Sequence, residues 1–393
     1  MRQARLILED GTTFFGWSFG YDGNTAGEVV FNTAMTGYPE SLTDPSYAGQ
    51  ILVTTFPLIG NYGVPDTGMG ADGLPTFMES DRIHPKALVV ADYSEQYSHW
   101  NAKESLAEWL KHEQIPAITG IDTRRLTKVL REHGVMMGRI ILSTESTENR
   151  ESTEDIEDTE NYGSVNWVEK VSCKEVITYK PNNNDTQSVS SVPPKVVLVD
   201  CGVKANIIRC LIRRGIEVVR VPWDYDFNQL EFDGLFLANG PGDPEQCGKT
   251  VDHIRTFLDN EKKKADGKND GDNSTTVRPL MGICLGNQLL ARAAGANTYK
   301  LKYGHRSHNQ PVREVGTEHC YITSPNQGYA VDDSTLPSDW EPLFVNMNDG
   351  SNEGIRHKKN PWMSAQFHPE ACSGPTDTEW MFDEFVAMLE RKR

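Results

Sequence analysis

The chain has 393 residues, 37% of them hydrophobic, and a formal net charge of −17 at pH 7. This length exceeds one ordinary hydrophobic core, so it predicts two domains. The negative charge argues against a nucleic-acid partner and against an anionic membrane surface, because both require clustered Lys and Arg side chains.

The cysteine content and the distribution of apolar residues favour a cytoplasmic protein. The seven cysteines are odd in number and form no Cys-x-x-Cys pair, which fits reduced thiols and no disulfide framework. The N-terminal apolar stretch is too short for a signal peptide, and no run of 18 apolar residues predicts a membrane span.

Residues 1–143 mix short β-type runs with turn residues and two amphipathic stretches. The predicted strands are 4–8, 27–32, 50–56 and 87–91, and the predicted helices are 103–113 and 123–133. We therefore expect a smaller, β-rich α/β domain at the N-terminus.

Polar, low-complexity segments separate this domain from the rest of the chain. Residues 143–160 carry almost no apolar side chains, and residues 181–194 are rich in Asn, Ser and Pro. We predict an acidic and polar linker or insertion over 144–193, with the domain boundary near residue 190. A second low-complexity insertion, a solvated loop, is predicted over 261–276.

From residue 194 to residue 393, strands and helices alternate. The predicted strands are 196–200, 216–221, 235–238 and 280–283, and the predicted helices are 205–214, 253–263, 289–294 and 378–389. This alternation predicts an α/β domain with an open, mostly parallel sheet and helices on both faces. Ligands of such sheets bind at the carboxyl ends of the strands, where the loop 240–244 and Cys284 fall.

Cys284 lies at the predicted junction of a strand and a helix, which is the geometry of a nucleophile elbow. Gly282 and Gly286 on either side allow a strained turn, and a helix N-terminus favours a thiolate. His368 and Glu370 follow another apolar strand and, two residues apart, can share a face. The carboxylate would then orient the imidazole toward the sulfur, which predicts a catalytic triad.

Simpler interpretations exist for these residues. A buried cysteine is commonly an inert small hydrophobe, and an isolated His-x-Glu is usually chance. The combination of the Cys284 turn with His368 and Glu370 favours the catalytic interpretation.

The glycine-rich loop after residue 239 resembles a phosphate-binding loop only superficially. Five residues separate Gly242 from Gly248 instead of four, and they include Asp243 and Glu245, which would repel phosphate. The position of the loop favours a role in holding an oxyanion.

Three other polar residues are conspicuous but less informative. His305 and His308 have no evident third ligand nearby, so no metal site is predicted. Lys204 follows a strand end and could face the cleft, but an exposed surface lysine is the simpler interpretation.

Three motifs occur in the order found in class I, or triad, glutamine amidotransferase domains, which residues 194–393 resemble. The motifs are Asn-Gly-Pro-Gly-Asp-Pro at 239–244, Gly-Ile-Cys-Leu-Gly-Asn-Gln at 282–288 and His-Pro-Glu-Ala at 368–371. The segments 37–50, 60–63 and 120–124 resemble the small subunit of glutamine-dependent carbamoyl-phosphate synthetase. The resemblance covers nearly the whole chain apart from the polar insertions.

The resemblance implies that the chain hydrolyses L-glutamine through a thioester on Cys284, with His368 and Glu370 as its catalytic partners. The ammonia would pass to a synthetase large subunit or fused synthetase domain, which makes carbamoyl phosphate from bicarbonate and ATP for pyrimidines and arginine. The resemblance implies no cofactor in this chain, because ATP and metal ions would bind the synthetase partner.

The resemblance also implies which groups contact glutamine. Backbone N–H groups of Gly242 and Leu285 would hold the oxyanion. The positions that match the family's glutamine-binding residues are Ser46, Gly240, Gln288, Asn326, Gly328 and Tyr329. Without the resemblance, Ser46 would be interpreted as the cap of a turn after Pro45.

The chain departs from the family pattern at two places. Asn287 stands where the family usually has His, and Cys372-Ser373-Gly374-Pro375 replaces the usual Ser or Thr, Pro, Gly, Pro. Neither departure removes a member of the triad, but both bear on local loop geometry and therefore on turnover.

Two other functions compete with the amidotransferase prediction. One is a free-standing cysteine hydrolase of γ-glutamyl substrates, against which the N-terminal domain argues. The other is a non-catalytic module that regulates a synthetase, against which the retained Cys284, His368 and Glu370 argue.

Overall fold

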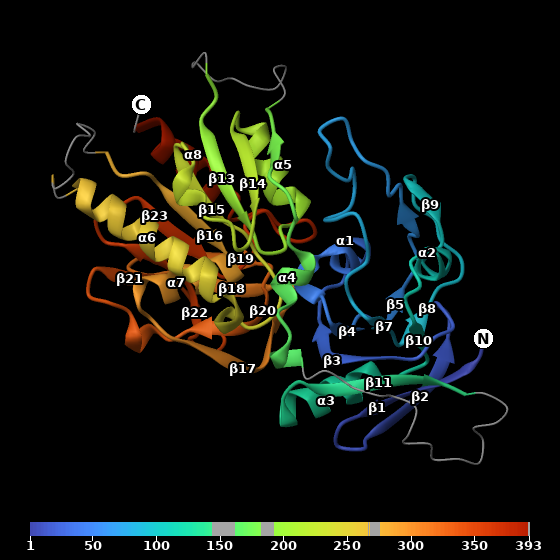
Figure 1. Ribbon diagram of the computed structural model, residues 1–393. Coiled ribbons are helices and arrows are strands. Elements are labelled where there is room, and N and C mark those ends of the chain that lie inside the picture. The colour runs from blue at the N-terminus through green and yellow to red at the C-terminus, as the bar shows by residue number, and fades with distance from the viewer. Residues whose placement is uncertain (144–161, 182–191, 266, 268–275, 392–393) are drawn as a thin grey trace. The chain divides into compact units, whose positions relative to one another are not determined.

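The computed structural model divides into two compact units (Figure 1). The described residues are 1–143, 162–181, 192–265, 267 and 276–391. Unit 1 comprises Met1–Gly70, Leu74–Val165 and Lys302–Ser307, and unit 2 comprises Ala71–Gly73, Asn166–Leu301 and His308–Arg393. Among the described residues, no helix combines the length and the apolar character needed to cross a membrane.

Unit 1 is built on a closed barrel with the strand order β1-β11-β3-β4-β7-β10-β2. Its strands are β1 (Gln3–Leu8), β2 (Thr13–Ser18), β3 (Thr25–Asn32), β4 (Gln50–Thr54), β7 (Ala87–Val89), β10 (Ala117–Thr119) and β11 (Met136–Leu142). The neighbours β3-β4-β7-β10 pair in parallel, and the remaining pairs are antiparallel. The predicted strands are confirmed, but closure into a barrel was not predicted.

Successive side chains of the barrel strands belong to two separate hydrophobic cores in unit 1. Val29 and Ile51 belong to a cluster to which barrel strands and α3 contribute, whereas their neighbours Val30 and Leu52 belong to a second cluster with α1 and α2. Successive side chains of a strand point to opposite faces, so both faces of β3 and β4 are buried.

The helices of unit 1 are α1 (Tyr38–Thr43), η1 (Pro45–Tyr47), α2 (Leu106–His112) and α3 (Thr123–His133), and its short strand pairs are β5 (Leu58–Ile59) with β8 (Asp92–Tyr93) and β6 (Val64–Pro65) with β9 (Ala102–Glu104). The predicted helix 123–133 is confirmed. The predicted helix 103–113 starts too early, because Ser105 and Glu108 form a capping box and the preceding residues form β9.

Unit 2 contains a ten-stranded sheet with the order β12-β14-β13-β15-β16-β23-β22-β21-β18-β19. Its strands are β12 (Ile177–Tyr179), β13 (Lys195–Asp200), β14 (Glu217–Pro222), β15 (Gly234–Leu237), β16 (Leu280–Ile283), β18 (Gln310–Glu314), β19 (Cys320–Thr323), β21 (Trp340–Asn346), β22 (Asn352–His357) and β23 (Trp362–Ala365). The run from β14 to β23 is parallel, which confirms the predicted parallel α/β sheet. The antiparallel strands on both edges were not predicted.

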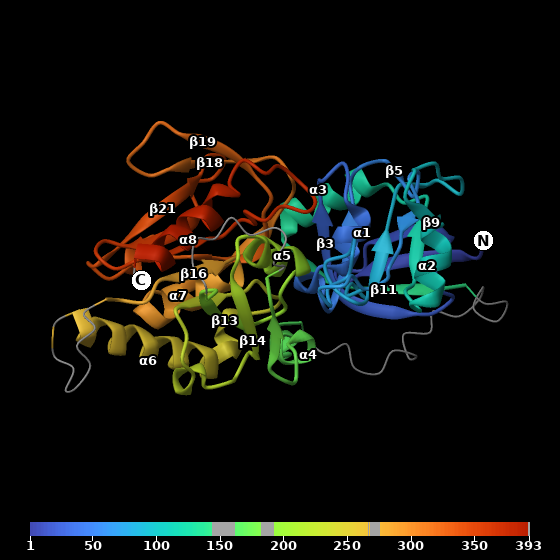
Figure 2. The same ribbon diagram turned by 90° about the horizontal axis from the view of Figure 1, so that it is seen from above.

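Helices cover both faces of this sheet, as can be followed in Figure 2. Leu235 and Leu237 of β15 join the core formed with α6 and α7. Phe236 between them stacks on Phe382 and meets Phe385 edge to face, both in α8. The helix η2 (Tyr162–Ser164) belongs to unit 1. The helices of unit 2 are α4 (Trp167–Val171), α5 (Ala205–Arg213), η3 (Phe227–Gln229), η4 (Pro244–Cys247), α6 (Gly248–Ala265), α7 (Leu285–Ala294), η5 (Asp333–Thr335) and α8 (Trp380–Arg391). A further two-stranded sheet joins β17 (Thr298–Arg306) to β20 (Asn326–Val331).

The structure assigns parts of the predicted polar segments differently from the composition. The predicted segments 144–161, 182–191 and 268–275 lie outside the described residues. Residues 166–181 belong to unit 2 and include β12, which pairs with β14, whereas the composition predicts a boundary near residue 190.

The predicted solvated insertion from residue 261 is wrong in its first part. Helix α6 continues to Ala265, and Glu261 is fully buried. Its carboxylate accepts hydrogen bonds from the backbone N–H of Arg278 at 2.7 Å and from the Arg278 Nε at 2.8 Å. Composition alone would classify this part of the helix as a polar loop, but its buried carboxylate has a charged partner in Arg278.

Candidate active site

Cys284 lies in a one-residue turn between β16, which ends at Ile283, and α7, which begins at Leu285. Its φ of 55° and ψ of −105° are unusual for a residue with a side chain. The Cys284 N–H donates to the Ala365 carbonyl of the neighbouring strand β23 at 2.8 Å. The elbow is therefore present, but the helix starts directly after Cys284, earlier than the predicted 289.

Gly282 and Gly286 provide space at the elbow, and neither has a positive φ. A Cβ on Gly286 would overlap the carbonyl oxygen of Leu237, and a Cβ on Gly282 would overlap backbone atoms of Gly286. The glycines allow the strained turn, as predicted, through the space that they leave, and the residue with the strained backbone is Cys284 itself. Gly286 is required because α7 begins in direct backbone contact with β15, and Gly282 is required because the first turn of α7 lies against β16.

His368 and Glu370 lie in a turn after β23, so their convergence does not come from strand alternation as predicted. The turn is closed by the Ala371 N–H, which donates to the His368 carbonyl at 3.1 Å, and the His368 N–H donates to Ser324. His368 Nδ1 lies 2.6 Å from Glu370 Oε1, and both side chains are buried. Because an ionised carboxylate can only accept, Nδ1 carries the proton.

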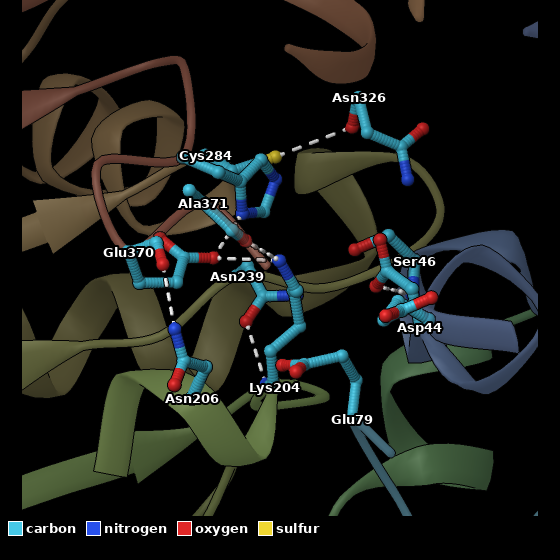
Figure 3. Close-up of polar contacts among 12 residues, drawn as sticks. Asp44, Ser46, Glu79, Lys204, Asn206, Asn239, Cys284, Asn326, Glu370 and Ala371 are labelled. Carbon is cyan, nitrogen blue, oxygen red and sulfur yellow. Dashed lines mark hydrogen bonds and ion pairs between the residues drawn. The ribbon is translucent and has the colours of Figure 1, made fainter. Parts of the chain in front are cut away.

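Lys204 and Asn206 hold the Glu370 side of this pair (Figure 3). Lys204 Nζ donates to Glu370 Oε1 at 3.1 Å and to the Ala371 carbonyl at 2.7 Å, and Asn206 Nδ2 donates to the Glu370 carbonyl at 2.6 Å. Lys204 is only 5% exposed, so its interpretation as a surface lysine is wrong. Its position after β13, at the carboxyl edge of the parallel sheet, was the signal that pointed into the site.

The charges of these groups stabilise one another. Burial by itself lowers the pKa of His368, but the Glu370 carboxylate and Cys284 outweigh it and raise this pKa above its ordinary value. Burial by itself raises the pKa of Glu370, but Lys204 and then His368 bring it below its ordinary value. At neutral pH the arrangement therefore favours an imidazolium held between a carboxylate and a sulfur.

The two backbone N–H groups predicted to hold an oxyanion lie at the start of α7 and in the loop after β15. Leu285 is the first residue of α7, so its N–H has no partner within the helix. Gly242 has a φ of 86°, in the loop that follows β15. In the same loop, a Cβ on Gly240 would overlap the carbonyl oxygen of Cys201, so this position accepts only glycine.

Hydrogen bonds join several of the residues predicted to bind glutamine within unit 2 to one another, and one of these residues contacts Cys284. Cys284 Sγ lies 3.5 Å from the Asn326 carbonyl oxygen, and Gln288 Nε2 donates to the Tyr329 carbonyl at 2.9 Å. Asn326, Gly328 and Tyr329 belong to β20. The Tyr329 hydroxyl donates to Asp243 Oδ2 at 3.1 Å, which ties β20 to the glycine-rich loop.

Ser46 belongs to unit 1, where it lies in η1 and is buried. Its N–H donates to Asp44 Oδ1 at 2.9 Å, so the residue that caps this turn is Asp44. The simpler interpretation of Ser46 as the cap is therefore wrong.

The histidines outside the triad form no metal centre in the part of the chain that the structure describes. No group of three His, Cys, Asp or Glu side chains there is arranged to hold a metal ion. His308 is mostly buried, and this burial, followed by the charge of Lys204, lowers its pKa to about 4.

Two family models match the chain. The carbamoyl-phosphate synthase small chain, CPSase domain, matches residues 6–140, and glutamine amidotransferase class-I matches residues 197–388. The carbamoyl phosphate synthase arginine-specific small chain of Saccharomyces cerevisiae is 48% identical over 398 residues, which cover 99% of this chain and 89% of that protein.

Longer relatives also match over the whole chain. The multifunctional protein pyr-3 of Neurospora crassa is 49% identical over 98% of this chain and 21% of that protein. The mitochondrial carbamoyl-phosphate synthase [ammonia] of Mus musculus is 44% identical over 99% of this chain and 24% of that protein. The chain thus spans about a fifth to a quarter of the length of these two relatives.

Proposed function

Since the chain belongs to the family of carbamoyl-phosphate synthase small chains, we propose that it hydrolyses L-glutamine and supplies the ammonia for carbamoyl phosphate synthesis. The observation that carries this proposal is the geometry around Cys284. The nucleophile stands at the N-terminus of α7, and a buried His368–Glu370 pair with a spacing of 2.6 Å belongs to the same unit.

The proposed chemistry forms and breaks a thioester. The Cys284 thiolate attacks the carboxamide carbon of glutamine, and the carbonyl oxygen takes up negative charge facing the N–H groups of Gly242 and Leu285. The C–N bond breaks as His368 transfers its proton to the leaving nitrogen, which departs as ammonia. Water then gives a proton to His368 and attacks the thioester, which releases glutamate and the thiolate.

Glu370 keeps the imidazole in the required orientation during both steps. Its carboxylate fixes the proton on Nδ1 of His368, so that Nε2 is the atom that exchanges a proton with the substrate. Lys204 donates to the same carboxylate oxygen, Oε1, as His368, and its positive charge keeps Glu370 ionised while His368 changes charge.

The glutamine-binding residues are assigned from the resemblance. We assign the binding of glutamine to Gly240, Gln288, Asn326, Gly328 and Tyr329 in unit 2, and to Ser46 in unit 1. Four of the five in unit 2 lie on α7 or β20, the elements that adjoin Cys284.

The partner that would consume the ammonia is a synthetase, either a separate large subunit or a domain of the same polypeptide. One relative is named a small chain and another a multifunctional protein, so both arrangements have a counterpart among similar proteins. We assign ATP, bicarbonate and metal ions to that partner and no cofactor to this chain. Ammonia released into neutral water would become non-nucleophilic ammonium, so the two reactions must be coupled.

We assign the protein to the cytoplasm. All seven cysteines lie in described parts of the chain and are free thiols, which suits a reducing compartment.

One observation favours a regulatory alternative. A relative with 44% identity carries a name that specifies ammonia, so family membership alone does not establish the use of glutamine. In this chain the complete set Cys284, His368 and Glu370 supports hydrolysis.

The deciding experiment measures ammonia and glutamate released from glutamine by the wild-type chain, Cys284→Ser and the control Cys320→Ser, which changes an exposed cysteine. Each is assayed with and without a synthetase large subunit, ATP and bicarbonate. We expect activity that rises with the active partner, disappears in Cys284→Ser and persists in Cys320→Ser. Activity in Cys284→Ser would contradict the nucleophile, inactivity of the wild type with its partner would favour a regulatory module, and a full rate without the partner would favour an independent hydrolase.

A further inference from the structure

The amide of Gln288 is held so that its oxygen alone is available to a ligand. Gln288 lies one turn along α7 from the nucleophile, and its N–H points toward the Cys284 carbonyl at 3.4 Å. Its Nε2 donates to the Tyr329 carbonyl at 2.9 Å and to Gln366 Oε1 at 3.2 Å. An amide nitrogen has two N–H groups, so both donors are used within the described structure.

The orientation of this amide follows from the polarity of its neighbours. The Tyr329 carbonyl is a backbone acceptor, so it must face the nitrogen of Gln288 and not its oxygen. Gln366 Oε1 is likewise held as an acceptor, because Asn287 Nδ2 donates to it at 2.9 Å. Both neighbours of the Gln288 amide are therefore acceptors, and both hold its nitrogen toward them.

The orientation of Asn287 is determined in turn by the adjacent strands. The Ile355 N–H donates to Ser364 Oγ at 3.3 Å, and the Ser364 hydroxyl donates to Asn287 Oδ1 at 2.7 Å. The Ser364 hydroxyl has a second possible acceptor in the Ile355 carbonyl at 3.2 Å, so the Tyr329 carbonyl at the other end of the chain of hydrogen bonds is what fixes the amides. It requires the nitrogen of Gln288, which requires the oxygen of Gln366, which in turn requires the nitrogen of Asn287.

Burial makes this orientation difficult to reverse. Asn287, Ser364 and Gln366 are all 0% exposed, so water cannot replace a hydrogen bond that a rotated amide would lose. The nitrogen of Gln366 has no hydrogen-bond partner within the described residues. Gln366 is thus held in the network through its oxygen, the atom that Asn287 and Gln288 share.

We propose that Asn287 and Gln366 are positioning residues that turn the oxygen of Gln288 toward the substrate, so that the site selects a ligand with a hydrogen-bond donor there. Apart from the carboxamide that Cys284 attacks, the donor that glutamine offers is its α-ammonium group. This inference rests on the proposed hydrolysis of glutamine and names the group that gives the site its preference for an amino acid. It also accounts for Asn287, which retains a side-chain N–H where the family usually has His.

The test measures binding in the Cys284→Ser background, where no turnover occurs, by titration calorimetry of the full chain. The ligands are L-glutamine and glutaramate, which keeps the carboxamide and carboxylate but lacks the α-ammonium. Gln366→Met removes the shared acceptor and should weaken glutamine binding about tenfold or more, while glutaramate binding changes less than about threefold. Gln366→Glu keeps an oxygen at the shared position and should stay within about threefold of the parent for glutamine.

Two further variants separate positioning from stability. Thr250→Val removes another buried hydrogen bond of unit 2, from Oγ1 to the Trp223 carbonyl at 2.7 Å, and should leave both affinities unchanged. Asn287→Leu frees the Gln366 side chain to rotate, so it should cause the same selective loss of glutamine affinity. This variant keeps the inference testable if Gln366→Met does not fold.

The outcomes distinguish the inference from the proposed function. Absence of glutamine binding in the Cys284→Ser parent would overturn the proposed function and the inference with it. Two outcomes would overturn the inference alone. In one, the parent binds glutamine and neither Gln366→Met nor Asn287→Leu changes that affinity. In the other, these variants weaken the binding of glutamine and of glutaramate equally.

Discussion

Replacing Lys204 by Met tests whether the catalytic pair depends on a cation that the sequence did not mark as part of the site. Lys204 Nζ lies 3.1 Å from Glu370 Oε1, and both side chains are almost fully buried. At this distance the attraction between unit charges is roughly 5 kcal/mol for an effective dielectric constant of about 20. Removal of one partner of a buried ion pair typically costs about 3–5 kcal/mol, because it leaves an uncompensated charge.

We expect a loss near the lower end of that range, about 3 kcal/mol, because Glu370 retains His368 as a partner. For a domain of about 150–250 residues this corresponds to a fall in melting temperature of roughly 6–12 °C. Urea unfolding at neutral pH, monitored by tryptophan fluorescence, would give the free energy directly.

Lys249→Met provides the matched control. Lys249 Nζ lies 3.2 Å from Asp224 Oδ2, nearly the same distance, but the Lys249 side chain is 67% exposed. Solvent screens such pairs, so this variant should lose less than about 1 kcal/mol. Equal losses in the two variants, or a loss below about 1 kcal/mol in Lys204→Met, would refute the argument that burial makes the Lys204 pair important.

Two further predictions concern the elbow and the pH dependence of stability. Gly286→Ala should lower the unfolding free energy by about 1–3 kcal/mol and reduce glutamine hydrolysis, because its Cβ would overlap the Leu237 carbonyl. Gly248→Ala is the control in the same urea titrations, because the space around Gly248 is open. Equal effects of the two substitutions would contradict the steric argument. The Glu370 pKa is lowered, so its contribution to stability is present above the unfolded value of about 4.5 and is lost as the pH falls through the folded pKa. The His368 pKa is raised, so its contribution is present below about 6.5 and is lost as the pH rises through the folded pKa. The urea midpoint should therefore fall toward both acid and alkaline pH. In His368→Gln the fall toward alkaline pH should become smaller. The same fall at alkaline pH in His368→Gln as in the wild type would count against the ion pair.

Part of the site could be predicted because its signals are local in the sequence. A buried strand, a cysteine between close glycines and a following helix specify the elbow at Cys284 within a few residues, and the structure has β16 and α7 there. Helix α3 was predicted from its amphipathic pattern and has the predicted boundaries, where Asp122 caps its start and Gly134 follows its end.

The rest of the site depends on contacts between residues that are distant in the sequence. Glu370 is held by Lys204 and Asn206 from the start of α5, and the pattern around each residue gives no sign of the other. The barrel of unit 1 similarly requires β1 to pair with both β2 and β11, of which only the first is its neighbour in the chain.

The amino-acid sequence was sufficient to predict the parallel core of the unit 2 sheet with its alternating helices, and Cys284, His368 and Glu370 as a candidate triad, but not the antiparallel strands at the edges of that sheet. Periodicity and motif spacing carry this information, because they act over one element and its adjoining turn. Only the tertiary structure decided that Lys204 is buried against Glu370, that the glycines of the elbow provide space, and that Asn287 and Gln366 orient Gln288. These properties depend on which atoms meet in the folded core, and a side chain's surroundings there come from segments that the chain brings together only on folding.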